Sequence, residues 1–172
     1  MNKSTLTTII LLALLPLALS AQEIRDMDIR VVVAKDGSAT VTTDWDVTVT
    51  SGTEWYIPVG NLGPMKVTSL KVSENGKTFV NEGFNWDSGR SLEQKKGRSG
   101  LVRKTDGVEL CWGQGSLGDH KWRTVVKMTG LVQGMTDYDG FNFQFVNTQM
   151  VAGPKHVKVT IVNQTGGPEW TS

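Results

Sequence analysis

Residues 29–49 read IRVVVAKDGSATVTTDWDVTV, and this stretch decides the fold class. Between Ala39 and Val49 every second residue falls on one face, and the residues between them are Thr or Asp. A period of two is typical of a strand in a sheet with one dry face. The run Ile29–Ala34 precedes it, joined by Lys35-Asp36-Gly37-Ser38. Because Asp-Gly suits a type I′ turn, the stretch predicts an antiparallel hairpin.

The same pattern recurs along the chain. Pro58 makes Trp55–Val59 an edge strand, and Asn75-Gly76 closes another hairpin. About eight or nine strands then predict an all-β fold, a two-sheet antiparallel β-sandwich of immunoglobulin-like or related type. Little helix is expected beyond a turn near Ser91–Lys96, and Asp87–Thr105 is expected to be a long irregular flap. The further predicted strands are Lys66–Ser73, Thr78–Trp86, Val108–Trp112, Trp122–Met128, a stripe of Phe141, Phe143 and Phe145, and His156–Val162.

The N-terminus has the features of a secretory signal peptide. Lys3 precedes an apolar run from Ile9 to Leu19, and small residues follow before Gln22. The run is shorter than the ~20 apolar residues that span a bilayer. We therefore expect residues 1–21 to be a signal peptide, 22–164 a β-sandwich domain, and 165–172 a linker or truncated end. The expected location is the periplasm or cell surface, with membrane anchoring through a segment absent from this chain as an open alternative.

Charge and cysteine content narrow the function classes. The chain has 18 Lys and Arg against 17 Asp and Glu, and Lys3 is the only charged residue in the predicted signal peptide. A nucleic-acid binder normally has a basic excess, so no nucleic-acid partner is expected. Cys111 is the single cysteine, so the fold is not a disulfide framework.

The segment GQGSLG matches the dinucleotide fingerprint G-x-G-x-x-G at Gly113, Gly115 and Gly118. That fingerprint binds pyrophosphate only where a helix follows it, and here Lys121–Met128 keeps a strand period. The segment is therefore interpreted as a glycine-rich hairpin loop. Cys111 with His120 could form a nucleophile and base, but the strand pattern favours a buried, inert thiol.

No metal or cofactor site is predicted. Two histidines and one cysteine, none in paired spacing, cannot supply a four-ligand zinc site without several carboxylates. Asp137-Tyr138-Asp139-Gly140 resembles the start of a calcium loop but lacks the final bidentate Glu, so a turn is favoured. We expect no catalytic residues and no cofactor.

Two sets of residues are candidate contacts. Trp55, Trp86 and Trp170 lie outside the clearest core-facing rows and could stack on sugar rings, although packing in a core or turn is the commoner role of tryptophan. A basic stretch could touch an anionic lipid surface, although such stretches are more often solvated loops. That stretch contains Arg90, Lys95, Lys96, Arg98, Arg103 and Lys104 against Glu93 alone.

Several segments resemble one known family. They are VVVAKDGSATVTTDWDV, WYIPVGNLG, FNWDSGRSLEQKKGRSGLV, VELCWGQGSLGDHKW and LVQGMTDYDGFNFQFVN, and the similarity extends over essentially all of residues 22–172. The chain resembles the N-terminal extracytoplasmic domain of bacterial predicted membrane proteins grouped as domain of unknown function 2207. The resemblance implies an exported all-β ectodomain, with a membrane-spanning region farther along in the family and no catalytic residues to transfer.

The expected function is therefore that of an exported, non-enzymatic ectodomain of a bacterial envelope protein. It is expected to act by binding or as a structural and assembly module. The alternative is a carbohydrate-binding module that uses exposed tryptophans. The sequence leaves the binding partner undetermined, and the candidates are the rest of a membrane-anchored chain, an anionic lipid surface or a glycan.

Overall fold

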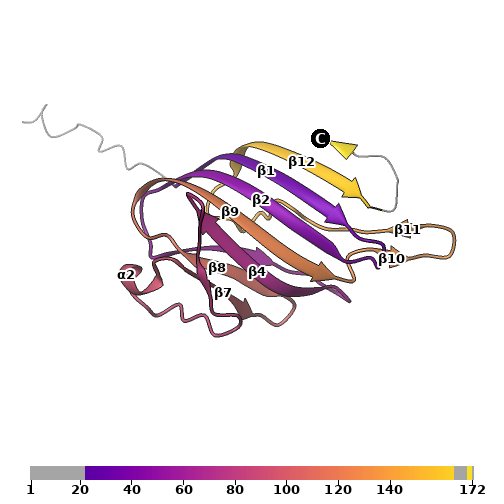
Figure 1. The fold of residues 1–172 in the computed structure, drawn as a ribbon, viewed down its shortest axis with the longest axis horizontal. Coiled ribbons are helices and arrows are strands. Elements are labelled where there is room, and N and C mark those ends of the chain that lie inside the picture. Colours follow the sequence, from indigo (N-terminus) through magenta and orange to yellow (C-terminus); the bar gives the residue numbers. More distant parts are fainter. Residues whose placement is uncertain (1–21, 165–169, 172) are drawn as a thin grey trace, which may run out of the picture.

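The computed structural model describes residues 22–164 and 170–171, and for Trp170 and Thr171 it describes the backbone alone. The described residues form a β-sandwich with one short helix, which confirms the predicted fold class (Figure 1). The predicted signal peptide, residues 1–21, lies outside the described residues, as does most of the predicted linker, residues 165–172. Within the described ranges, no helix is long and apolar enough to cross a membrane.

A large sheet of seven strands forms one layer of the sandwich. β1 and β2 lie near its middle, and the hairpin predicted from residues 29–49 joins them. Its order is β13 (Trp170–Thr171), β12 (Pro154–Asn163), β1 (Glu23–Val33), β2 (Ala39–Val49), β9 (Gly118–Thr129), β4 (Lys66–Glu74) and β5 (Lys77–Thr78).

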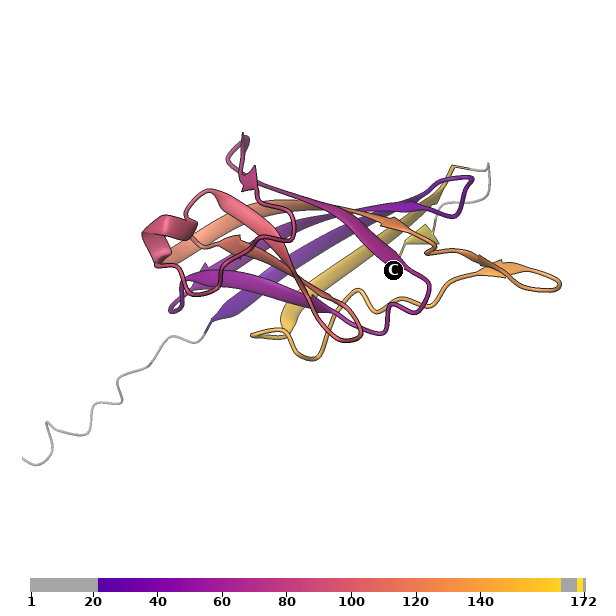
Figure 2. The same ribbon diagram turned by 90° about the horizontal axis from the view of Figure 1, so that it is seen from below.

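A smaller sheet of four strands forms the second layer and covers only part of the first (Figures 1 and 2). As Pro58 predicts, β3 is an edge strand, which pairs with β8 alone. The order is β3 (Glu54–Val59), β8 (Val108–Gly113), β7 (Arg98–Arg103) and β6 (Val80–Asn81). The remaining elements are α2 (Leu92–Lys95) and a two-stranded hairpin of β10 (Gln133–Gly134) and β11 (Asp139–Gly140).

Two strand pairs are parallel, which the expected antiparallel topology did not include. β12 pairs with β1 in parallel from Ile24 opposite Pro154 to Val33 opposite Asn163. β6 pairs with β7 in parallel over two residues. Parallel neighbours need a long crossover connection. Residues 34–153 separate β1 from β12 along the chain, and residues 82–97, which include α2, separate β6 from β7.

The β1–β2 hairpin turns at the predicted residues, but the turn is not the predicted type I′, because Gly37 has a positive φ and Asp36 does not. Val33 lies opposite Ala39, and the Ala34 N–H donates to the Ser38 carbonyl at 2.9 Å. Gly37 has φ 76°, a conformation that L side chains rarely adopt, and Asp36 Oδ1 accepts from the Ser38 N–H at 3.0 Å. Alternate residues of β2 are buried along its whole length, as the period of two predicts.

Four tryptophans occupy the space between the sheets. Trp45 on β2 lies opposite Trp122 on β9, and Trp55 on β3 lies opposite Trp112 on β8. The rings of Trp112 and Trp122 meet edge to face with centroids 5.6 Å apart, and Trp55 lies 5.4 Å from Trp122. Such tilted arrangements favour aromatic pairs beyond their burial alone. The tryptophans therefore hold the two layers together.

The expected flap, Asp87–Thr105, contains both a missed strand and the expected helical turn. Ser91 caps α2, accepting from the Gln94 N–H and forming a capping box. β7 follows, pairs with β8 and belongs to the small sheet. A side-chain carbon at Gly100 would lie 2.9 Å from Cβ of Trp86, so residues 82–97 lie directly on this sheet.

The phenylalanine stripe is not a strand. Residues 141–153 have no regular structure, yet Phe141, Phe143 and Phe145 are partly buried against the core. Phe143 and Phe145 line a small apolar cavity with Met27 and Ile29 of β1. Ile57 of β3 and Leu110 of β8 line the same cavity, so the irregular segment packs beside the edge of the small sheet. The alternation of phenylalanine and polar residues here reflects alternate burial of side chains in a segment that pairs with no neighbouring strand.

Candidate functional site

Two of the three candidate sugar platforms, Trp55 and Trp86, are buried. Trp55 is buried between the sheets, and Trp86 is buried on the outer side of the small sheet, where its Nε1 donates to Glu54 Oε2 at 2.7 Å. The candidate role of Trp55 and Trp86 in ligand stacking is therefore wrong, and the commoner role, packing in a core or turn, holds for both. Trp170 pairs through its backbone with Ile161, and its side chain lies outside the described part of the chain.

Lys95 is a buried structural cation and not a surface contact. Its side chain is 1% exposed and its Nζ lies 3.1 Å from Glu54 Oε2. The ammonium also donates to Thr53 Oγ1 at 2.8 Å and to the Ser88 carbonyl at 2.7 Å. All three of its donors are thereby satisfied, as a buried ammonium requires. The predicted contact of Lys95 with an anionic surface is wrong, since this side chain attaches α2 to β3.

The other predicted basic contacts are engaged with neighbours. Glu82 accepts from both Arg90 and Arg98 at 2.9 Å through Oε1, and Arg90 also lies over the Trp86 ring. Lys96 contacts Glu93 at 3.9 Å, and Lys104 contacts Glu109 at 3.0 Å. The Arg103 guanidinium lies 3.8 Å from the centroid of Phe84. The stretch is thus a set of local ion pairs and two cation–π contacts.

Cys111 is buried, as predicted. It lies between Tyr56 and Gly100 in the register of the small sheet. Burial, reinforced by the charge of Glu54, raises the pKa of its thiol to about 12. A nucleophilic cysteine needs a lowered pKa, so this thiol is not poised for catalysis.

The loop Gly113–Gly118 joins two strands that belong to different sheets. β8 lies in the small sheet and β9 in the large one, so the expected hairpin is wrong. The expectation that no helix follows the glycines is confirmed, because Gly118 begins β9. Gly115 and Gly118 have positive φ, and a side-chain carbon at Gly113 would collide with the Lys95 carbonyl. These glycines allow the chain to pass from the small sheet to the large sheet, and they allow α2 to lie close to the end of β8.

His120 anchors this loop, a role that the sequence did not indicate. Its Nδ1 lies 2.7 Å from Glu74 Oε1, and its Nε2 lies 3.1 Å from the Ser116 carbonyl and 3.4 Å from the Ser116 hydroxyl. The ring stacks on Trp122 with centroids 4.8 Å apart. The spacing resembles a serine triad. However, Nε2 is closer to an acceptor carbonyl than to the hydroxyl, so the ring is placed to hold the loop rather than to deprotonate Ser116.

The residues that resemble a calcium loop lie in the β10–β11 hairpin. The Met135 N–H donates to the Tyr138 carbonyl at 2.8 Å, closing the turn that was favoured over a calcium loop. Among the described residues, no group of three or more His, Cys, Asp or Glu side chains is arranged to hold a metal ion.

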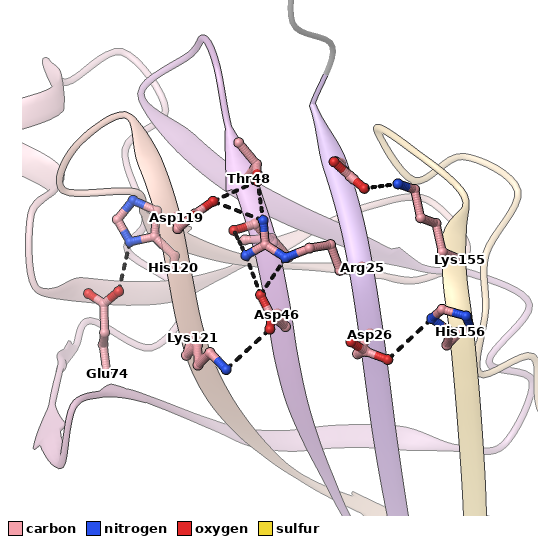
Figure 3. Close-up of polar contacts among 12 residues, drawn as sticks. Arg25, Asp26, Asp46, Thr48, Glu74, Asp119, His120, Lys121, Lys155 and His156 are labelled. Atoms are coloured by element: carbon pink, nitrogen blue, oxygen red, sulfur yellow. Dashed lines mark hydrogen bonds and ion pairs between the residues drawn. The ribbon is translucent and has the colours of Figure 1, made fainter.

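The outer face of the large sheet carries two rows of acidic and basic side chains across four strands, and Figure 3 shows the row that contains Asp26 and Asp46. Asp26 lies opposite Asp46 and Asp28 opposite Asp44, so like charges face each other at the centre. A basic side chain flanks each aspartate. The flanking contacts are His156 with Asp26 at 3.4 Å, Lys158 with Asp28 at 3.5 Å, Lys121 with Asp46 at 3.2 Å and Arg123 with Asp44 at 2.6 Å. The acidic and basic side chains of this face therefore largely balance each other's charge.

Arg25 adds a further cation at one end of these rows. It lies where the β1–β2 register shifts, and its guanidinium contacts Asp46, Thr48 and Asp119, the last at 2.8 Å (Figure 3). The hydrogen bond from Thr48 and then the contact with Arg25 lower the pKa of Asp119. Arg25 therefore links the ends of three adjacent strands.

A polar pocket of about 500 Å³ lies where three segments meet, and we call it the amide pocket. It is lined by residues 58–61 at the end of β3, residues 104–109 of the β7–β8 turn and the start of β8, and residues 143–144 and 147–149 of the irregular segment. A side-chain carbon at Gly107 would collide with the Val59 carbonyl, so glycine there lets the turn lie against β3. Its volume lies within the ~300–1,000 Å³ typical of small-molecule sites.

Many side chains of the amide pocket have no partner within the described part of the chain. Asn147 does have one, because its Nδ2 donates to the Pro58 carbonyl at 2.9 Å. Polar groups without internal partners are available to a ligand. They are the side chains of Asn61, Thr105, Asp106, Gln144, Thr148 and Gln149. The sequence carried no signal for this site, because its segments are far apart along the chain and follow no motif.

Comparisons with known proteins add little to these observations. No protein-family model matches the chain, and no curated protein does. Among solved structures, the chain is similar to a proposed protease from Parabacteroides distasonis, with 14% identity and a TM-score of 0.41 over 88% of this chain. An M1 zinc metallopeptidase from Deinococcus radiodurans gives 12% identity and a TM-score of 0.35 over 82%. The chain spans about a third of the length of these proteins, 30% and 32%, and likeness at this level assigns no activity.

Proposed function

We propose that this chain is an exported, non-enzymatic β-sandwich module of a bacterial envelope protein, and that it binds envelope material through the amide pocket. The amide pocket is the observation that carries the proposal. Unpartnered amide, hydroxyl and carboxylate groups from three separate segments converge there on one hollow. Concave sites in which a few polar groups converge beside an apolar surface are typical of ligand binding, and Phe143 supplies that surface here.

Two further observations support a binding role over a catalytic one. The pKa of the Cys111 thiol is raised, and the His120 ring holds a loop carbonyl. The resemblance to the extracytoplasmic domain of unknown function 2207 supports the envelope location, and the apolar run of residues 9–19 supports export. The described tryptophans and Lys95 are buried, so the ligand is not expected at those residues.

Co-sedimentation with a bacterial cell-envelope fraction tests this proposal. Wild-type protein should sediment with the fraction, and a Gln144→Ala, Gln149→Ala double variant should remain largely in the supernatant. Both glutamines are exposed, so the double variant should keep its fold. Gln164→Ala removes another exposed amide, from the end of β12, and should behave as wild type. Equal sedimentation of wild type and double variant would contradict the proposal.

A further inference from the structure

The charge of the amide pocket limits its ligand. Lys104, its one cation, is paired with Glu109 at 3.0 Å, so this pair contributes no net charge. Asp106 then leaves the lining with one unpaired negative charge among the described residues. A phosphate, sulfate or carboxylate ligand would face that carboxylate without a free cation to balance it, so an anionic ligand is disfavoured.

The hydrogen-bonding groups match hydroxyls. The amides of Asn61, Gln144 and Gln149 each donate and accept, and the hydroxyls of Thr105 and Thr148 do the same. A ligand hydroxyl also donates and accepts, so a molecule with several hydroxyls can pair with such a lining. Purely accepting or purely donating ligands would leave half of these groups unpaired, which costs binding free energy.

Phe143 supplies an apolar surface to the same pocket. Its ring is half-buried and meets Phe145 at 5.0 Å between centroids, which fixes its position. An aromatic ring beside hydrogen-bonding groups suits a ligand that is apolar on one side and polar at its rim, as a sugar ring is.

The neighbouring strand edge argues against an extended peptide. β3 is the edge strand beside the pocket, but Pro58 lacks an N–H and its carbonyl accepts from Asn147. A peptide added as a further strand needs main-chain donors and acceptors along that edge. At Pro58 the main-chain donor is absent and the main-chain acceptor is already bonded to Asn147, so this edge is poorly suited to an added strand.

We infer that the amide pocket binds a neutral carbohydrate, a short oligosaccharide or the end of a longer glycan, with a sugar ring against Phe143 and its hydroxyls on the surrounding amides. This inference rests on the proposed function, because it names the ligand class of the same site. It differs from a tryptophan-based sugar platform in using none of the predicted tryptophans.

Isothermal titration with defined trisaccharides tests the ligand class. The probes are maltotriose, cellotriose, mannotriose and chitotriose, each compared with a uronic-acid trisaccharide as the anionic control. At least one neutral trisaccharide should bind to the wild type, and the anionic control should bind more weakly. The Gln144→Ala, Gln149→Ala variant should lose about two- to tenfold in affinity for each hydrogen bond removed, and Gln164→Ala should lose none.

Two results would overturn the inference: no binding of any neutral trisaccharide at millimolar concentration, or equal binding of the anionic control. Its failure is separable from that of the proposed function. If envelope material still sediments with wild type and not with the double variant, the pocket is a binding site for another ligand class. If both experiments fail, neither statement holds.

Discussion

Lys95 Nζ lies 3.1 Å from Glu54 Oε2 in a site where the lysine side chain is 1% exposed. Glu54 also accepts from Trp86, so one carboxylate attaches both α2 and the preceding loop to the small sheet. Replacing Lys95 by Met leaves Glu54 without its cation, and breaking a buried pair on one side costs about 3–5 kcal/mol. We expect Lys95→Met to lower the free energy of unfolding by about 3 kcal/mol, measured by urea denaturation.

Lys96→Met is the matched control. Lys96 is the next residue, and its side chain is 58% exposed with a distant partner, Glu93 at 3.9 Å. The Lys96→Met variant should change the free energy of unfolding by less than about 0.5 kcal/mol. Adding Glu54→Gln to Lys95→Met should recover part of the loss, because the amide oxygen still accepts from Trp86. Similar losses for Lys95→Met and Lys96→Met would contradict the structural role of Lys95.

The Cys111 thiol should be unreactive in the folded protein. Burial raises its pKa to about 12, so almost no thiolate exists at pH 8. A thiol reagent such as iodoacetamide should label it only after denaturation, as intact-mass measurement would show. Cys111→Ala should leave binding unchanged and cost about 1–2 kcal/mol of stability through the small cavity it creates. Rapid labelling of the native protein would mean that the outer side of the small sheet is open.

Glu82 should make stability depend on pH in the acid range. The hydrogen bond from Arg90 lowers its pKa, burial opposes this, and the hydrogen bond from Arg98 lowers it further. Because the folded pKa lies below the ordinary value of about 4.5, the stabilisation is complete above that value and is lost as pH falls through the folded pKa.

Glu82→Gln removes this contribution. At pH 7 we expect the variant to melt about 2–4 °C below wild type, and we expect the gap to close as pH falls below 4.5. Melting curves by circular dichroism between pH 3 and 7 measure this difference in melting temperature. A gap independent of pH would show that Glu82 acts through packing alone.

The central aspartates of the large sheet should differ in their effect on stability. Asp28 lies directly opposite Asp44, and its only cation, Lys158, is 3.5 Å away within the described residues. Asp28→Asn relieves like-charge repulsion and should be neutral or stabilising by about 0.5 kcal/mol. Asp46→Asn loses contacts with Arg25 and Lys121 and should destabilise by about 1 kcal/mol. Urea midpoints in low and high salt check both, since salt should shrink the difference.

Local patterns predicted the parts of this fold that local chemistry determines. The turn Lys35-Asp36-Gly37-Ser38 and the alternation of β2 gave the central hairpin correctly. The alternation of β8 and β9 was also right. However, alternation alone does not indicate whether two successive strands belong to the same sheet. The predicted hairpin at Gly113–Gly118 is therefore a connection between the two sheets.

The candidate site could not be found in the same way. Trp55 and Trp86 stood out as aromatic residues beyond the clearest core rows, but contacts with Trp122 and Glu54, distant in sequence, bury them. Lys95 appeared in a basic run, yet its partner Glu54 lies on another strand. The amide pocket joins three segments with ordinary polar sequences, so only their arrangement in space reveals it.

Side-chain amide resonances of the pocket provide the sharpest measurement of its role. Their NH₂ signals, in ¹⁵N–¹H spectra, report directly on Asn61, Gln144 and Gln149. Adding solubilised bacterial envelope glycopolymer should shift these three pairs of signals and leave that of Gln164 in place. Shifts confined to the charged outer face around Asp44 and Arg123, or no shifts at all, would contradict binding at the amide pocket.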